Sequence, residues 1–192
     1  DSIGTCTTNS EGGPGEWNLL GEKDLCGGSL GTTCPSISNL EYDMWFDMPT
    51  QVVYHALEFD PDITAGGNTY IESLQCDFDD NGRANWRYFN SDVNQWMDFS
   101  PTVPCTLSPG SGWHHLQIWM TMDSGTYTYQ SVLLDGTELL TSGSTTVPAC
   151  SNTGYCANWA DRIWVEQQLD NDAADSSSTE FAYYDLYTLT VW

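Results

Sequence analysis

The segment from Gly112 to Leu140 constrains the fold more than any other part of the chain. Apolar and polar residues alternate through it, and the turn sequences Asp123-Ser124-Gly125 and Asp135-Gly136 interrupt the alternation. Because successive side chains of a β-strand point to opposite faces, this pattern predicts three strands joined by two tight hairpins. In the first strand one face is apolar, and the other carries His115, Gln117 and Trp119. The apolar face needs a second sheet to cover it, and the polar face is left for solvent or for a ligand.

Short alternating segments separated by turn residues continue from residue 37 to the end of the chain. We expect further strands at residues 40–48, 52–59, 70–78, 84–89, 163–169 and 181–192. Many short strands without a helical period predict one all-β domain, built as a two-sheet antiparallel sandwich. The Gly-, Ser-, Thr- and Cys-rich residues 1–36 are expected to form a disulfide-pinned N-terminal arm on the β-sandwich of residues 37–192.

Several of these segments resemble a known superfamily. Trp113-His114-His115-Leu116, followed by a hairpin and Leu134-Asp135-Gly136, resembles the WHH…DG pattern of the laminin-G-like and concanavalin-A-like lectin/glucanase superfamily. Tyr54 to Asp60 is similar to a strand of bacterial secreted lectin-like domains, and Asp185 to Trp192 to the closing strand. The resemblance implies a concanavalin-A-like jelly roll. It does not imply one activity, because this fold hosts lectins, hydrolases, lyases and adhesion modules.

The charge of the chain narrows the choice of partners. Its 27 acidic residues face only four basic ones, which gives a formal net charge of -23. Such a chain is repelled by nucleic-acid phosphates and by anionic lipid, so neither nucleic acid nor a membrane surface is expected as a partner. Neutral polysaccharides or other glycans, cations and basic partners remain.

The cysteines predict an oxidising compartment. Seven cysteines occur in the chain and none forms a CxxC pair, which favours disulfides over zinc and a secreted, extracellular location. Cys76 and Cys105 can link neighbouring strands, and Cys150 and Cys156 can close a short loop, but the sequence leaves the connectivity open. One pair among Cys6, Cys26 and Cys34 then leaves a spare thiol, which allows self-association.

Tryptophans on non-core faces predict the ligand site. Trp45, Trp119 and Trp164 each fall on the polar side of a predicted strand. Aromatic rings cover the C–H faces of sugars, and neighbouring carboxylates, amides and imidazoles bind hydroxyl groups. The predicted function is non-catalytic, lectin-like recognition of a neutral glycan on the concave sheet. The polar partners in that site are Glu41, Asp43, His115, Gln117 and Glu166.

A glycan-cleaving enzyme is the first alternative. The strand from Glu41 to Asp47 resembles the E-x-D-x-x-E strand of retaining glucanases, which implies a nucleophile at the first Glu and an acid at the last. Glu41 and Asp43 match this pattern, but Phe46, or Trp45 in the unbulged variant, occupies the acid position. Glu41 and Glu166 are therefore the candidate catalytic residues of a glycoside hydrolase, and a polysaccharide lyase on the same fold is a further variant.

A turn sequence suggests a calcium site. The sequence from Asp77 to Gly82 resembles the opening of a calcium loop, with Asp77, Asp79 and Asn81 as ligands. Tyr88 occupies the twelfth position, where a full loop has a bidentate Glu, and the same sequence serves as a hairpin turn without metal.

The second alternative function is a structural subunit of an extracellular matrix or filament, joined through β edges or the spare cysteine.

Overall fold

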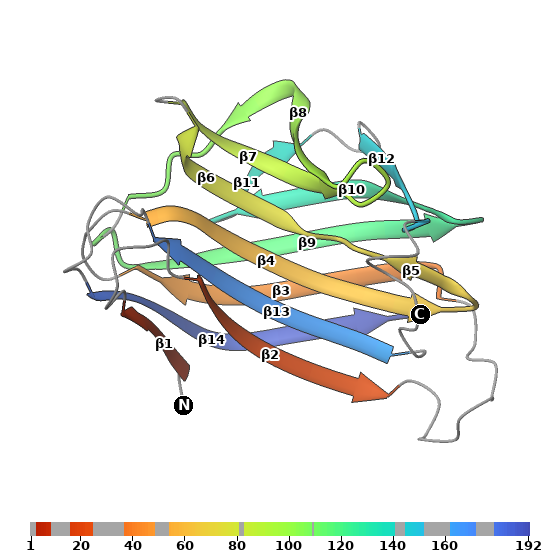
Figure 1. The fold of residues 1–192 in the computed structure, drawn as a ribbon, viewed down its shortest axis with the longest axis horizontal. Coiled ribbons are helices and arrows are strands. Elements are labelled where there is room, and N and C mark those ends of the chain that lie inside the picture. The colour runs from red at the N-terminus through yellow and green to blue at the C-terminus, as the bar shows by residue number, and fades with distance from the viewer. Residues whose placement is uncertain are drawn as a thin grey trace.

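The chain folds into two stacked β-sheets (Figure 1). The computed structural model describes residues 3–8, 16–24, 37–48, 54–80, 83–108, 110–140, 145–151, 162–171 and 179–192, and for β1 and β2 it describes the backbone. These residues form fourteen strands, and every strand pair is antiparallel. The predicted all-β jelly-roll sandwich is thereby confirmed. Within the described ranges no helix is long and apolar enough to span a bilayer.

Sheet A contains the three strands that the segment from Gly112 to Leu140 predicted. Its strand order is β1-β14-β3-β9-β10-β11, and β12 also pairs with β10. The bounds are β1 Ile3–Thr8, β14 Thr179–Val191, β3 Asn39–Asp47, β9 Trp113–Asp123, β10 Thr126–Leu134, β11 Thr137–Leu140 and β12 Thr145–Pro148.

Sheet B lies in front of sheet A in the view of Figure 1. Its strand order is β2-β13-β4-β6-β7-β8, and β5 pairs with β4. The bounds are β2 Glu16–Asp24, β13 Arg162–Asn171, β4 Tyr54–Ala65, β6 Leu74–Asp80, β7 Arg83–Asn90, β8 Gln95–Pro104 and β5 Asn68–Tyr70. The segment of residues 1–36 thus supplies one strand at the edge of each sheet.

The two hairpins of sheet A have the turns that their sequences predict. Ser124 and Gly125 have φ angles of 50° and 85°, and Asp135 and Gly136 have 52° and 74°. Two consecutive left-handed residues form the hairpin turn whose twist matches that of the flanking strands. Gly at the second position accepts this conformation without the steric cost that a Cβ brings. These turns fix the register of β9, β10 and β11.

The core lies between the sheets and follows from alternation. In β3, residues Leu40, Tyr42, Met44 and Phe46 are fully buried, while the residues between them are exposed or half-buried. β9 repeats the pattern with Leu116, Ile118 and Met120, and sheet B contributes Leu57, Phe59 and Ile63. Each buried side chain of this size contributes about 1.5–3 kcal/mol to the free energy of unfolding.

One of the disulfides that the sequence allows is confirmed. Cys76 of β6 is bonded to Cys105, which follows β8, with the Cα atoms 5.7 Å apart. Cys150 is also disulfide-bonded, but its candidate partner Cys156 lies outside the described residues. Cys26 and Cys34 lie outside them as well, so the spare thiol stays a prediction.

Candidate ligand-binding faces

Six of the eight predicted ligand-binding residues meet on the outer face of sheet A. β3 and β9 are neighbours, and their register pairs Glu41 with Trp119, Asp43 with Gln117 and Trp45 with His115. Residues directly opposite in an antiparallel pair have their side chains on the same face. Together with Trp192, these six residues form what we call the tryptophan face.

Asp43 organises the centre of the tryptophan face. Its Oδ1 lies 2.8 Å from His115 Nε2, and its Oδ2 accepts a hydrogen bond of 2.9 Å from Gln117 Nε2. The His115 ring stacks on Trp45, with 4.5 Å between centroids and 6° between planes. A carboxylate with both oxygens engaged holds the imidazole and the amide in place. The face therefore presents fixed polar groups beside an aromatic wall.

A pocket opens beside this cluster. It has a volume of about 370 Å³ and is lined by Glu41, Gln117, Ile118, Trp119, Ser131, Leu133 and Trp192. The exposed fraction is 42% for Trp119 and 54% for Trp192, so two aromatic rings border the pocket and remain accessible. Trp192 was not among the predicted site residues. Its backbone N–H and C=O pair with Asn39, which extends β14 alongside β3 by one residue. Side chains alternate between the two faces of the closing strand, and Trp192 follows Val191 there. This alternation was the sequence signal that could have placed Trp192 on the outer face.

The two remaining predicted residues, Trp164 and Glu166, lie in the other sheet. Both belong to β13 in sheet B, where their backbones pair with Asp62 and Asp60 of β4; their side chains lie outside the described residues. The expectation of one hollow shared by Trp45, Trp119 and Trp164 is therefore wrong. Alternation places a residue on the core or the outer side of its own strand, but it does not tell which sheet the strand joins. For the same reason Glu41 and Glu166 do not flank a common site.

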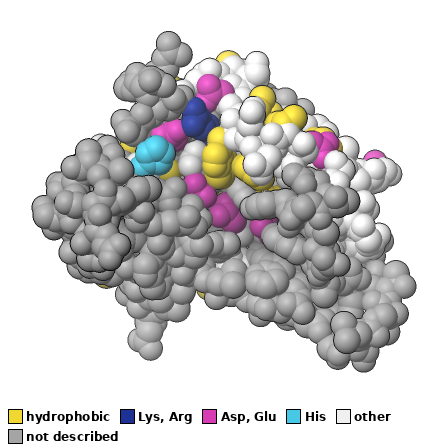
Figure 2. Space-filling view, viewed as in Figure 1, with side chains coloured by type: hydrophobic (Ala, Val, Ile, Leu, Met, Phe, Trp, Pro, Cys, Tyr) yellow, Lys and Arg dark blue, Asp and Glu magenta, His cyan; other side chains and the backbone are white. Residues whose placement is uncertain are grey.

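The outer face of sheet B carries a row of buried polar side chains. Between 3% and 7% of each of these residues is exposed: Glu58, Asp60, Asp62, Gln75 and Asp77. We call this row the carboxylate face. On β4 its members alternate with the core residues Leu57, Phe59 and Ile63. Figure 2 shows this side of the molecule, where acidic side chains lie close to a basic one.

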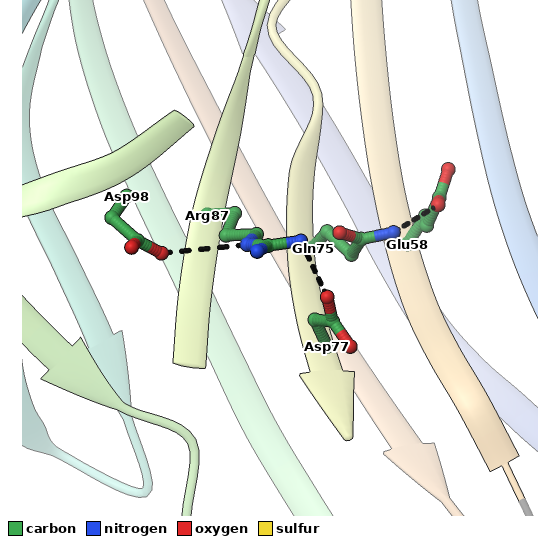
Figure 3. Close-up of polar contacts among 5 residues, drawn as sticks. All are labelled: Glu58, Gln75, Asp77, Arg87 and Asp98. Atoms are coloured by element: carbon green, nitrogen blue, oxygen red, sulfur yellow. Dashed lines mark hydrogen bonds and ion pairs between the residues drawn. The ribbon is translucent and has the colours of Figure 1, made fainter. Parts of the chain in front are cut away.

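Hydrogen bonds and ion pairs cross the carboxylate face from β4 to β8 (Figure 3). Gln75 Nε2 of β6 donates to Glu58 Oε1 of β4 over 2.6 Å. Arg87 of β7 lies between two acids, with Nη1 2.5 Å from Asp77 Oδ2 and Nε 3.4 Å from Asp98 Oδ1. The Arg87 guanidinium thus offsets part of the repulsion among these carboxylates.

A fully buried carboxyl group adjoins this row. The backbone N–H of Glu72 donates to Asp62 Oδ1 over 2.9 Å, and the Glu72 side chain is 0% exposed. Within the described ranges neither carboxyl oxygen of Glu72 has a hydrogen-bond partner. Burial, and secondarily the charge of Asp62, raises the pKa of Glu72 well above its ordinary value. This environment favours the protonated form of Glu72.

The β4 row is a candidate site that the sequence analysis did not single out. Glu58-Phe59-Asp60-Pro61-Asp62 has carboxylates at its first, third and fifth positions, all on one face. It fits the unbulged form of the glucanase pattern better than the strand that begins at Glu41, because its last position is a carboxylate. The strand that contains Glu41 lies in sheet A instead.

The predicted calcium ligands are only partly described. Asp77 is buried and paired with Arg87, while the Asp79 side chain and all of Asn81 lie outside the described residues. Across the part of the chain that the structure describes, no group of three or more His, Cys, Asp or Glu residues is arranged to hold a metal ion. Calcium binding stays a prediction.

Comparisons with solved structures identify the fold. The metal-free carbohydrate recognition domain of Emp46p superposes with a TM-score of 0.53 at 6% identity, over 98% of this chain and 87% of that one. Rv0315, an immunostimulatory antigen and pseudo beta-1,3-glucanase of Mycobacterium tuberculosis, gives 0.53 at 12% identity, over 100% and 75%. The chain has the concanavalin-A-like lectin/glucanase fold. No protein-family model matches the sequence, and no curated protein matches it.

Proposed function

We propose that this chain is a secreted carbohydrate-binding domain that recognises a neutral glycan through the tryptophan face. The observation that carries the proposal is the pocket between Trp119 and Trp192, with Glu41 and Gln117 in its lining. It combines accessible aromatic surface with hydrogen-bonding groups, which are the two requirements of sugar recognition.

The chemistry of the pocket suits a pyranose ring. The apolar C–H face of a sugar gains from contact with an indole, while its hydroxyl groups need planar acceptors and donors at the rim. The Glu41 carboxylate accepts hydrogen bonds, and the Gln117 amide both accepts and donates. Because Gln117 is already held by Asp43, little side-chain entropy is lost when it binds a ligand.

Two observations outside the pocket support the proposal. A carbohydrate recognition domain, that of Emp46p, has the same fold. The Cys76–Cys105 disulfide is typical of proteins from oxidising compartments, which supports secretion.

Calorimetric titration with neutral oligosaccharides tests the proposal. We expect Trp119→Ala to weaken binding at least tenfold, about 1.4 kcal/mol, because it removes a wall of the pocket. Trp113→Ala is the matched control: Trp113 lies on the same strand and is 44% exposed, but it does not line the pocket. Equal affinities for the wild type and Trp119→Ala would remove this pocket from the proposal.

A second candidate function is glycoside hydrolysis on the carboxylate face. It is favoured by the single row of Glu58, Asp60 and Asp62 on β4. By the glucanase pattern, Glu58 would take the nucleophile position and Asp62 the acid position. The test is release of new reducing ends from a panel of polysaccharides, with Glu58→Gln and Asp62→Asn each lowering the rate at least a hundredfold. Activity that survives both substitutions would place the chemistry elsewhere.

A further inference from the structure

The lysines and arginines of the chain are confined to one of the two sheets. All four basic residues of the chain lie on strands of sheet B: Lys23 on β2, Arg83 and Arg87 on β7, and Arg162 on β13. The described strands of sheet A contain no lysine or arginine, yet they carry several carboxylates, among them Glu41, Asp43, Asp47 and Asp185. The tryptophan face therefore presents negative charge without lysine or arginine beside it.

The carboxylates of this face differ in what they contact. Asp43 is engaged on both oxygens by His115 and Gln117. Glu41 is exposed, and it makes no hydrogen bond or ion pair with any residue that the structure describes. Its position in the sheet places it directly opposite Trp119, whose ring borders the same pocket. An available carboxylate thus lines the same pocket as two accessible indole rings, those of Trp119 and Trp192.

From this geometry we infer that the preferred ligand of the tryptophan face is an amino-sugar polymer with protonated, unacetylated amino groups. The inference rests on the proposed glycan recognition, and it replaces the neutral glycan of that proposal with a cationic one. The ammonium group would pair with Glu41 and lie close to the electron-rich faces of the tryptophans, where cations are attracted. The C–H face of the same sugar residue would stack on Trp119.

The charge of the whole chain acts in the same direction. A formal net charge of -23 attracts a polycation over a distance limited by the salt concentration. Neutral glycans would still stack on the tryptophans, but they would gain neither the ion pair nor this long-range attraction. Polymers with carboxylate or sulfate groups would be repelled.

Calorimetric titrations of the full chain with neutral and cationic oligosaccharides test the inference. The probes are the β-1,4-linked glucosamine hexamer, its fully N-acetylated form and cellohexaose, each at pH 5.5 in 50 mM salt. We expect the glucosamine hexamer to bind about tenfold more tightly than its N-acetylated form, and 300 mM salt to reduce this preference. Glu41→Gln should bring the ratio of the two affinities close to one. The matched control is Glu138→Gln on β11, which removes an exposed charge outside the pocket and should keep the preference.

Each result decides between the inference and the proposal on which it rests. Equal affinities for the two hexamers, or a preference that survives Glu41→Gln, would overturn the amino-sugar inference while leaving glycan recognition intact. Failure of all three oligosaccharides to bind would overturn both. Hexalysine is the last probe. If hexalysine binds as tightly as the glucosamine hexamer, and Trp119→Ala weakens the binding of neither ligand, charge alone explains the binding and the inference is overturned.

Discussion

Tyr42 of sheet A and Gln167 of sheet B share a hydrogen bond across the interior of the sandwich. Gln167 Nε2 donates to the Tyr42 hydroxyl over 2.9 Å, and neither residue is more than 2% exposed. Burial raises the pKa of Tyr42 well above its ordinary value, and the hydrogen bond from Gln167 acts in the opposite direction. The protonated hydroxyl in turn donates to Met44 Sδ over 3.0 Å. This contact links β3 to β13 across the interior of the sandwich.

The Tyr42→Phe variant tests the contribution of that bond. It leaves the Gln167 amide buried without its acceptor, so we expect the free energy of unfolding to fall by about 1–3 kcal/mol. Adding Gln167→Leu removes the stranded donor and should recover part of the loss. Urea unfolding followed by tryptophan fluorescence measures both effects. A single variant as stable as the wild type would show that the bond contributes nothing net.

The Cys76–Cys105 disulfide is expected to be the larger stabilising feature. It joins residues 29 positions apart, and closing a loop of that length restricts the unfolded chain by about 3–4 kcal/mol in the chain-entropy model. The Cys76→Ala/Cys105→Ala variant should lose stability on that scale in guanidinium unfolding. Replacing the pair with alanines avoids burying a hydroxyl group. A loss below about 1 kcal/mol would contradict the expectation.

Alternation in the sequence predicted individual strands and their faces well. It located β3 and β9, and it assigned Glu41, Asp43, Trp45, His115, Gln117 and Trp119 to the outer side of their strands. The adjacency of β3 and β9, which brings these residues together, comes from long-range pairing between segments about 70 residues apart. No local pattern encodes that pairing, and for this reason Trp164 was grouped with strands of the wrong sheet.

β4 is longer than the sequence analysis predicted. The strand was expected to end at Phe59, ahead of Pro61, but it continues to Ala65. β6 pairs with residues 56–59 of β4 and β5 pairs with residues 63–65, so Pro61 faces a break between these two neighbours. On its other side Pro61 lies opposite Val165 of β13, so this residue without an N–H has a partner strand on one side only. Ending the strand early hid the alternation of Glu58, Asp60 and Asp62.

The sequence of the edge strand β8 has no clear alternation of apolar and polar residues from which a strand could be predicted. Most of Gln95–Pro104 is exposed, and Phe99 is its one fully buried position. Prolines at 101 and 104 also suit an edge, where fewer ladder hydrogen bonds are required. A strand that contributes so little to the core has few apolar positions with which to reveal its period.

Asp135 is expected to make stability depend on pH in the acid range. Partial burial by itself raises the pKa of Asp135, but hydrogen bonds from His114 Nδ1 at 2.8 Å and from the His115 N–H at 2.8 Å outweigh it and hold the pKa below its ordinary value. A carboxylate with a lowered folded-state pKa stabilises the fold above its unfolded-state pKa, and this contribution is lost as the pH falls through the folded-state value.

The Asp135→Asn variant isolates this effect. Asn accepts the left-handed φ of 52° at this turn, so the backbone is preserved while the charge is removed. Because the Asp135 side chain is 49% exposed, we expect a loss of only about 1 kcal/mol at pH 7. The difference from the wild type should shrink as the pH falls through the folded-state pKa of Asp135. A difference that stays constant from pH 7 to pH 2 would contradict a role for its charge.

Glu72 is expected to make stability depend on pH in the direction opposite to that of Asp135. Its pKa is raised by burial and by the charge of Asp62, so the fold favours the neutral acid. Its contribution to stability is fully present below the ordinary carboxyl pKa and is lost as the pH rises through the folded-state value. Glu72→Gln keeps the shape and stays neutral at every pH, and should therefore be more stable than the wild type at pH 8, by about 1–3 kcal/mol. This advantage should disappear near pH 4.

Urea unfolding of both proteins from pH 4 to pH 8 checks the sign. The quantity of interest is the difference between the two free energies of unfolding, because carboxylates that do not interact with Glu72 contribute equally to both. Glu138→Gln, on the exposed side of β11, serves as the control and should show no such trend. A Glu72→Gln variant that is less stable than the wild type at pH 8 would mean that the ionised carboxylate is bound by a compensating group in the folded protein. Glu72 would then be a charged partner inside the sandwich, and the reading of a neutral acid buried beside Asp62 would fail.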